Sequence, residues 1–453
     1  MKLRRLPFVM AMALMVSAPA PASVALSGED DASQSPDNTA DSALTLMEHW
    51  TPAENLPAWL VVGGQIRGRV ERPSGTSLAN DSPDTYYASR IRVDLSIKPF
   101  PWLTFFAEGQ DARTGGYNLP IAPTTLYNPL DLRQGFMEIR TKGRVPLKLK
   151  VGRQELSFGG ERVIGPADWG MSRTFDALDL TVGTNTTRVD FLAGSAVAID
   201  STRFDRHKPG EHFYGAYGSL KELPCGINVE PYVLFKQTLL VKAEDGVIGN
   251  ALVVSPGARL YGTAPGRFDY IVELLVQRGS YSADRVQAFG QSYVAGWTVA
   301  DVQWRPRLSG EYSYASGDAN STDGVRGTFD QFYPSNHGYY GMIDQFGWKN
   351  LKNWRAGFDC RIGKKIKVRT DYNQFFLATV QDALYNSSGG SIELNRKATS
   401  SNIGRETNTV AVYELSVWKF GAGYGHLFAG DYLKQSKLNV GYSYPYVFFT
   451  RNL

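Results

Sequence analysis

The chain has 453 residues, 46 glycines, 12% aromatic residues and a formal net charge of +4. So small a net charge says little about partners, and we expect no nucleic-acid partner. The two cysteines, Cys225 and Cys360, are too few for a disulfide framework or a cysteine-based metal site. We expect two lone thiols on strands; the alternative is a single disulfide formed in an oxidising compartment.

The N-terminus has the pattern of a secretory signal peptide. Lys2, Arg4 and Arg5 precede an apolar run over residues 6–16, and small residues near Ala22 and Ala25 offer cleavage sites. The apolar run is too short to span a bilayer, and no later segment approaches the roughly 18 apolar residues of a transmembrane helix. We therefore expect a cleaved signal peptide over residues 1–25 and no helical anchor after it.

Residues 26–58 form the next segment. Residues 27–42 are rich in Asp, Ser, Glu, Asn and Pro, a composition typical of a flexible segment without a packed core. Residues 44–57 are compatible with a short helix or cap. We expect a flexible periplasmic N-terminal segment, followed by a single domain over residues 59–453.

From residue 60 the pattern changes to an alternation of apolar and polar residues, which is typical of strands with one apolar and one polar face. The first candidate strand places Leu60, Val62, Ile66 and Val70 opposite Gln65, Arg67, Arg69 and Glu71. The second places Ile91, Val93, Leu95 and Ile97 opposite Arg90, Arg92, Asp94 and Ser96. The fifth and seventh alternate in the same way over residues 147–151 and 188–193. Charged residues thus share the face opposite the apolar one.

Counting such segments gives about 18 strands, each close to the roughly 9–11 residues that a tilted strand needs to cross a bilayer. The connections alternate between long (residues 72–88 and 111–131) and short (98–101 and 142–146). Outer-membrane barrels have long extracellular loops and short periplasmic turns, whereas a soluble sandwich or propeller has no reason for this alternation. The sequence predicts an all-β, single antiparallel transmembrane barrel in the outer membrane, with both termini in the periplasm. Aromatic residues near strand ends fit the interfacial girdles of such a barrel, as at Trp102, Trp297, Trp304, Trp354, Trp418, Tyr442 and Tyr446.

Because lipid lies outside such a barrel and water inside, we expect the charged faces to line the lumen. The predicted basic lumen residues are Arg67, Arg69, Arg90, Arg92, Lys148, Lys150, Arg153, Arg188, Arg355, Arg361, Lys367 and Arg369. The predicted acidic ones are Asp94, Glu138, Asp179, Asp190, Glu273, Asp359 and Asp371. Arginine and lysine in a narrow pore attract anions and bind carboxylates in succession. For each residue, a structural ion pair is the alternative to direct contact with a solute.

The longest predicted loop covers residues 316–353 and offers Phe329, Phe332, Tyr333, Tyr339 and Tyr340 for packing, as a lid over the barrel mouth would. Residues 318–324 resemble an oxygen-rich calcium loop, but the distal Glu is missing, which favours a solvated acidic loop. The five histidines show no ligand spacing, and hydrolase and phosphate-binding motifs are missing. We expect no metal, no cofactor and no enzymatic activity.

Three stretches resemble the alginate export family of outer-membrane barrels. The first runs from Val151-Gly152-Arg153-Gln154-Glu155 through Gly159-Gly160-Glu161-Arg162 and Trp169-Gly170 to Arg173-Thr174-Phe175-Asp176-Ala177. The second is Phe329-Asp330-Gln331-Phe332-Tyr333-Pro334-Ser335-Asn336-His337 with Gly338-Tyr339-Tyr340-Gly341, and the third is Gly425-His426-Leu427-Phe428-Ala429-Gly430-Asp431-Tyr432-Leu433.

The resemblance implies a monomeric 18-stranded barrel whose electropositive lumen conducts a polyuronate outward. Its expected partners are the lipid bilayer with lipopolysaccharide, an anionic polysaccharide or small anionic solutes, and the barrel-assembly machinery. That machinery usually reads a terminal aromatic residue, and this chain ends in Leu453. Two alternatives stay open: a general or anion-selective porin for small solutes, and a secreted all-β enzyme acting on polysaccharide, against which the alternating loop lengths argue.

Overall fold

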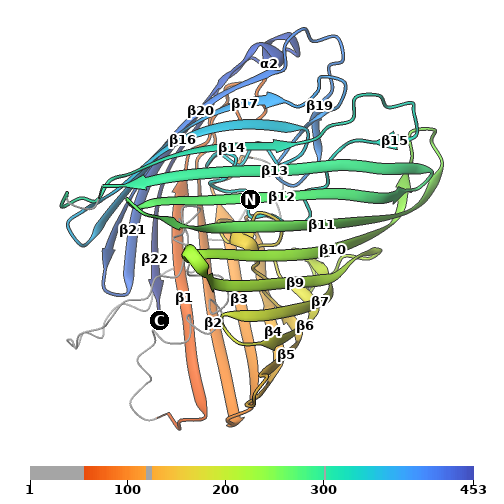
Figure 1. Ribbon diagram of the computed structural model, residues 1–453. Coiled ribbons are helices and arrows are strands. Elements are labelled where there is room, and N and C mark those ends of the chain that lie inside the picture. Colours follow the sequence, from red (N-terminus) through yellow and green to blue (C-terminus); the bar gives the residue numbers. More distant parts are fainter. Residues whose placement is uncertain (1–55, 119–124, 300–301) are drawn as a thin grey trace, which may run out of the picture.

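The computed structural model describes residues 56–118, 125–299 and 302–453, and these form a closed antiparallel barrel of 18 strands. The first and last strands, β1 and β22, pair from Gln65–Asn452 to Glu71–Tyr446 and thereby close the sheet (Figure 1). The predicted strand number is confirmed. The barrel strands are β1 Leu60–Glu71, β2 Tyr86–Phe100, β3 Leu103–Gly115, β4 Asn128–Thr141, β5 Leu147–Gln154, β6 Phe175–Gly183, β7 Thr187–Ala198, β9 Glu211–Leu223, β10 Ile227–Lys242, β11 Ile248–Ala264, β12 Phe268–Tyr281, β13 Asp284–Thr298, β14 Arg307–Ala315, β16 Leu351–Ile362, β17 Ile366–Leu377, β20 Asn402–Leu415, β21 Trp418–Ala429 and β22 Tyr442–Asn452.

The alternation along each strand decides which face of the barrel a side chain occupies. On β2, Ile91 and Val93 are 46% and 56% exposed, whereas Arg90 and Arg92 are buried. An outward face of exposed apolar side chains suits lipid, and the buried charged side chains then line the interior. For β2, the faces inferred from the sequence are those of the structure.

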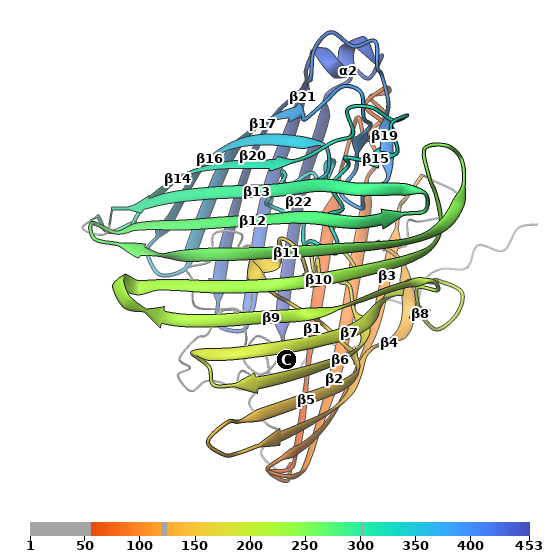
Figure 2. The same ribbon diagram turned by 45° about the vertical axis from the view of Figure 1, so that its right-hand side comes forward.

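The two ends of the barrel differ in their connections (Figure 2). At one end, which we call the short-turn rim, consecutive strands are joined by brief turns such as residues 101–102 and 363–365, and β1 begins and β22 ends there. The other end carries the long loops, with two exceptions: residues 243–247 join β10 to β11, and only residues 282–283 join β12 to β13. Among the described residues, no helix has the length and apolar character needed to cross a membrane.

Minor elements decorate the loops. Two-residue strands β8 (Arg206–His207) and β15 (Val325–Arg326) extend the main sheet, while β18 (Leu384–Tyr385) and β19 (Ser391–Glu393) form a separate pair. Short helices are η2 (Gly159–Glu161), η3 (Pro224–Gly226) and α2 (Asp431–Gln435). Cys225, in η3, is an exposed free thiol, and Cys360, on β16, is a buried one.

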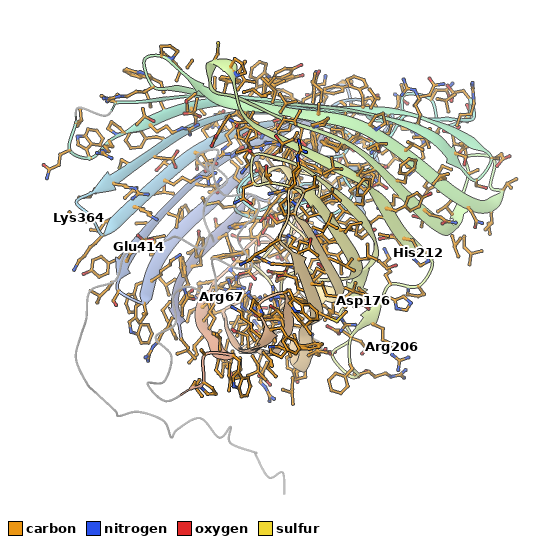
Figure 3. The ribbon with its side chains drawn as sticks, turned by 60° about the horizontal axis from the view of Figure 1, so that its bottom comes forward. Arg67, Asp176, Arg206, His212, Lys364 and Glu414 are labelled. Atoms are coloured by element: carbon orange, nitrogen blue, oxygen red, sulfur yellow. The ribbon has the colours of Figure 1, made fainter. Side chains whose placement is uncertain are left out.

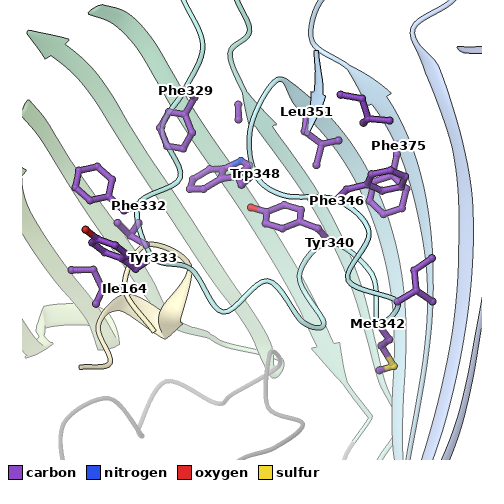
Figure 4. Packing of buried hydrophobic residues seen from close by; sticks show 14 of the residues in the cluster. Ile164, Phe329, Phe332, Tyr333, Tyr340, Met342, Phe346, Trp348, Leu351 and Phe375 are labelled. Atoms are coloured by element: carbon purple, nitrogen blue, oxygen red, sulfur yellow. The ribbon is translucent and has the colours of Figure 1, made fainter. Parts of the chain in front are cut away.

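Two long connections fold into the barrel rather than over it. We call residues 155–174, between β5 and β6, the first inner segment, and residues 327–350, between β15 and β16, the second. Phe329, Tyr340, Phe346 and Trp348 of the second are almost fully buried and pack together inside the barrel (Figure 4). The expectation of a lid over the mouth is therefore wrong, because the aromatic side chains of this loop are buried within the lumen instead.

The two inner segments are joined by backbone hydrogen bonds. Ile164 and Tyr333 form a parallel bridge, in which Tyr333 N donates to Val163 O at 2.9 Å and Gly165 N donates to Tyr333 O at 2.8 Å. Ser335 N donates to Glu161 O at 2.9 Å. This pairing satisfies backbone groups that would otherwise be buried without partners inside the barrel.

Candidate functional site

A cluster of arginines lines one side of the barrel interior. Arg67 and Arg90 are cross-strand partners on β1 and β2, and Arg69 and Arg92 lie two residues along the same faces. Arg133 of β4 joins them, and all five side chains are buried. We call these five residues the basic wall. Because like charges at such spacing repel, the wall requires acceptors that face it.

The principal acceptor is the carboxylate of Asp168, in the first inner segment. Arg90 donates to Oδ1 at 3.0 Å and to Oδ2 at 2.9 Å, and Arg92 donates to Oδ1 at 2.6 Å. Burial by itself would raise the pKa of the Asp168 carboxyl, but Arg90, Arg92 and Arg67 outweigh burial and hold that pKa well below its usual range. The basic wall therefore holds a bound carboxylate in its ionised form.

The basic wall also binds neutral oxygens. Arg67 donates to the carbonyl oxygens of Asp168, Trp169 and Gly170, at 2.8 Å for Trp169. Arg69 donates to Trp169 O as well, and its guanidinium lies 4.5 Å from the centre of the Trp169 ring. The wall thus combines carboxylate binding with several donors for uncharged oxygen atoms.

The remaining member, Arg133, ties the wall to both ends of the first inner segment. Its guanidinium is paired with Glu108 of β3 and Glu155, and it donates to the Ser172 hydroxyl at 2.7 Å. Neither Arg133 nor Asp168 was among the predicted site residues. Alternation counted from the inward Glu138 would place Arg133 on the outer face, but a bulge in β4 leaves Arg133 and Gln134 both buried, so its inward direction could not have been found from the sequence pattern.

Across the barrel, the first inner segment places the cation Arg162 next to two carboxylates of the barrel wall. Arg162 donates to Glu311 of β14 at 2.7 Å and to the Tyr340 hydroxyl at 2.8 Å, and it lies 3.8 Å from Glu273 of β12. Its guanidinium stacks 4.1 Å from the Tyr339 ring centre. The first inner segment thus places the Asp168 carboxylate against the basic wall and the Arg162 guanidinium against Glu273 and Glu311 on the opposite side of the barrel.

The second inner segment contacts two further strands of the barrel wall, β10 and β17. Lys236 of β10 lies 3.1 Å from the Asp330 carboxylate, and Arg369 of β17 donates to Gly338 O at 3.1 Å. His337 stacks on Trp169 with 4.8 Å between ring centres. Together the two segments connect the walls of the barrel through its interior.

An aromatic strip lies beside the basic wall on β22. Tyr442, Tyr444, Tyr446 and Phe448 are buried in the interior, and the residues between them are less buried. The expected interfacial position of Tyr442 and Tyr446 is therefore wrong. Their side chains lie on the same inward face of β22 as Phe448, whereas Val447, which is 52% exposed, lies on the outward face. The Tyr444 hydroxyl donates to Glu71 at 2.7 Å.

The strands place nearly all predicted lumen residues on the inward face. By alternation these are Arg67, Arg69, Arg90, Arg92, Lys148, Lys150, Arg188, Arg355, Arg361, Lys367, Arg369, Asp94, Glu138, Asp179, Asp190, Glu273, Asp359 and Asp371. Many form local ion pairs: Arg188 lies 3.1 Å from Asp190, and Lys367 lies 2.8 Å from Glu414. Direct contact of these residues with a solute stays a prediction.

Arg153 is the exception. It lies three residues after Lys150, an odd step along the strand, so alternation turns it to the outer face shared with the exposed Val151. There it pairs with Asp176 at 2.8 Å, on the side of the barrel where Figure 3 labels Asp176 and Arg206. The prediction that Arg153 lines the lumen is therefore wrong.

The acidic stretch 318–324 is held by hydrogen bonds within it and to the neighbouring Asp382. Asp318 N donates to Asp382 at 2.9 Å, and Asn320 N donates to Asp318 at 3.0 Å. In the part of the chain that the structure describes, no group of three or more His, Cys, Asp or Glu side chains could hold a metal ion.

A closed barrel with exposed apolar outer faces, short turns at the rim that holds its ends, and a charged interior defines an outer-membrane β-barrel channel. A sequence model described as Alginate export matches residues 58–443, and the chain belongs to this family. A search of curated proteins found no match.

Solved structures of outer-membrane proteins share the fold. Pseudomonas aeruginosa OpdQ is 12% identical, with a TM-score of 0.58, and the match covers 88% of this chain and 99% of OpdQ. OpdO from the same organism is 11% identical, with a TM-score of 0.56, covering 89% and 99% of the two chains. The structure titled OpdK with vanillate, also from this organism, is 10% identical, with a TM-score of 0.55, covering 86% and 98%.

Proposed function

We propose that the barrel is an outer-membrane channel that exports an anionic polysaccharide, a polyuronate such as alginate. The observation that carries this proposal is the binding of the Asp168 carboxylate by Arg90 and Arg92 on the basic wall. Asp168 stands in for the carboxylate of a uronate residue, since both present the same two oxygens to the guanidiniums. Paired hydrogen bonds of this kind are the preferred way for arginine to bind carboxylates.

Transport of a polyuronate along the basic wall requires that one carboxylate can replace another on the arginines. The Asp168 side chain is 22% exposed, whereas those of Arg90 and Arg92 are only 3% and 8% exposed, so a carboxylate in the lumen would have to displace Asp168 to bind these guanidiniums. The donors that Arg67 and Arg69 direct at carbonyl oxygens suit the hydroxyl and ring oxygens of a sugar. The nearby carboxylates Glu71 and Glu108 limit how tightly an anion is held, which favours its release.

A small carboxylated solute is the second candidate. The two inner segments, joined to each other and to opposite walls, leave less room inside the barrel than an empty lumen would. The similar OpdK was solved with vanillate, which is itself a small carboxylate. A porin for such solutes would use the same arginines with the inner segments held in place.

The deciding experiment is planar-bilayer recording of the refolded protein in a salt gradient, followed by oligouronates of increasing length. Neutral oligosaccharides of matched length serve as the control. Anion selectivity with block that strengthens with oligouronate length supports the polysaccharide channel. Anion-selective current that only short carboxylates reduce supports the porin, and cation selectivity contradicts both.

A further inference from the structure

The outward face of the barrel carries cations at the end that holds the long loops, which we call the long-loop end. On the barrel strands β12, β13, β14, β16, β17, β20, β21 and β22, the side chains that alternation places outward include no Asp or Glu. Four outward cations lie within four residues of the long-loop ends of their strands: Arg278, Arg285, Lys352 and Arg405. At the opposite ends of these strands, the described outward residues include one cation, Arg451. Positive charge on this face is thus concentrated at the long-loop end.

These four cations form no ion pair with another described residue. Lys352 lies between Tyr314 of β14 and Phe376 of β17, and Arg405 lies beside Gln374 of β17. Because β17 alone separates β16 from β20, Lys352 and Arg405 lie two strand spacings, roughly 10 Å, apart across the sheet. This arrangement suits a ligand that carries two anionic groups.

Next to these cations, toward the middle of each strand, the outward face is apolar. Trp354, two residues along β16 from Lys352, is exposed, as are Val276 on β12 and Phe289 on β13. In an outer-membrane barrel the long loops face outside, so outward cations at the edge of the lipid-facing surface lie at the level of the outer-leaflet headgroups. Basic residues in this position attract anionic lipid headgroups.

A groove of about 650 Å³ opens beside Arg405, on the outer face between β17 and β22. Its lining includes the amides of Gln374 and Asn402, the Phe428 ring, and Lys434 of α2, which stands at the long-loop end next to β21 (Figure 2). Gln374 Nε2 donates to Asn402 Oδ1 at 2.9 Å, which holds the two amides together at the groove wall. Amides bind sugar hydroxyls as donors and acceptors, and an aromatic ring packs against the apolar face of a sugar. The groove therefore suits a sugar next to an anionic group.

Two carboxylates also border the groove. Asp431 lies 3.9 Å from Lys434 on the same helix, and Asp81 belongs to the loop between β1 and β2. The strand wall of the groove thus has Arg405 as its permanently charged group, so an anionic ligand on this wall meets a cation.

We propose that this face binds the headgroup of a phosphorylated glycolipid of the outer leaflet. Arg405 and Lys352 bind its phosphates, the groove holds its sugar rings, and its acyl chains lie on the neighbouring apolar surface. A free anion in solution would use the cations alone, whereas a glycolipid uses the cations, the groove and the apolar surface together. This inference goes beyond the proposed function, because it does not depend on which anion passes through the lumen.

Native mass spectrometry of the refolded protein measures the binding directly. The probe is lipid A that carries two phosphates, and phosphatidylglycerol is the comparison lipid. We expect tight binding of lipid A and weaker binding of phosphatidylglycerol. Lys352→Gln together with Arg405→Gln should weaken the binding of lipid A by about tenfold or more. Gln374→Ala should weaken the binding of lipid A but not that of phosphatidylglycerol.

Arg451→Gln is the matched control, because it removes an outward cation at the other end of the same face. This variant should bind lipid A as the wild type does, and heat-modifiable migration in gels confirms that each barrel is folded.

Four results would overturn the proposal. The first two are unchanged binding of lipid A by the double variant and an equal loss of binding in Arg451→Gln. The third is equally tight binding of phosphatidylglycerol, which would mean that headgroup charge alone is recognised. The fourth is displacement of lipid A by inorganic phosphate, which would assign the cations to a free anion.

Discussion

Asp168 and Arg92 are separated by 76 residues in sequence, yet a terminal guanidinium nitrogen of Arg92 lies 2.6 Å from Asp168 Oδ1. This contact joins the barrel wall to the first inner segment. A carboxylate of the chain itself therefore occupies the anion site that we propose on the basic wall, and its charge should limit how strongly the wall attracts an external anion.

Asp168→Asn should therefore increase anion selectivity. The amide keeps the size of the side chain but removes the negative charge, leaving Arg90 and Arg92 to attract anions from the lumen. We expect the reversal potential in a salt gradient to shift toward that of the anion, and oligouronate block to strengthen several-fold. Asp81→Asn, at an exposed loop position, is the matched control. A variant whose selectivity and block equal those of the wild type would contradict a role for Asp168 in occupying the wall.

The contact should also resist mild acid. The pKa of the Asp168 carboxyl is lower in the packed state than its ordinary value of about 3.9. Its ion pairs therefore stabilise the packed state fully at any pH above this ordinary value, and this stabilisation is lost only as the pH falls through the lower pKa of the packed state. Glu161, in the same segment, has its pKa raised by burial, so protonating it favours the packed state. Hydrogen exchange of residues 155–174, corrected for intrinsic rates, should show equal or greater protection at pH 5 than at pH 7. Reduced protection at pH 5 would show that another group governs the packing.

Replacing Arg90 and Arg92 together with Ala should lower anion preference without unfolding the barrel. Two positive charges are removed from the interior, whereas the backbone ladders of β2 with β1 and β3 remain. Reversal potentials measure the effect, and heat-modifiable migration checks folding. The double variant Arg203→Ala with Arg206→Ala removes two exposed loop charges as the control. Unchanged ion selectivity in the Arg90 and Arg92 variant would count against the basic wall as part of the pathway.

Arg162→Met should loosen the inner segments. The substitution keeps much of the side-chain length but leaves Glu273 and Glu311 without this partner, and removing one member of a buried ion network costs about 3–5 kcal/mol. Hydrogen exchange over residues 155–174 and 329–346 should accelerate, while the barrel strands stay protected. Arg162→Lys keeps the charge without the planar guanidinium and should give an intermediate effect. Equal protection in all three proteins would mean that aromatic packing alone holds the segments.

The barrel could be predicted because strand alternation is a local property. Val93 and Arg92 reveal their faces from their neighbours alone, and the same rule, applied strictly from Lys150, would have placed Arg153 outside. The inner segments could not be predicted in this way. Asp168 lies in an irregular stretch without periodicity, so nothing local indicates that it meets arginines of β2. Two of the three family-like stretches largely coincide with the inner segments, and this was the available signal that those loops matter.

Val93→Asp tests the assignment of faces directly. Val93 lies in the middle of β2 and is 56% exposed on the outward face, where lipid is expected. A carboxylate there must be buried in hydrocarbon, and charged residues on the lipid face cost up to about 4 kcal/mol at the bilayer midplane, with Asp toward the lower end. We expect a lower free energy of unfolding in urea titrations from lipid vesicles, and a lower yield of folded protein. Val93→Leu, which keeps the surface apolar, should match the wild type. Normal stability and yield for Val93→Asp would mean that this face of β2 meets water, and the basic wall would then have to be reassigned to the outside of the barrel.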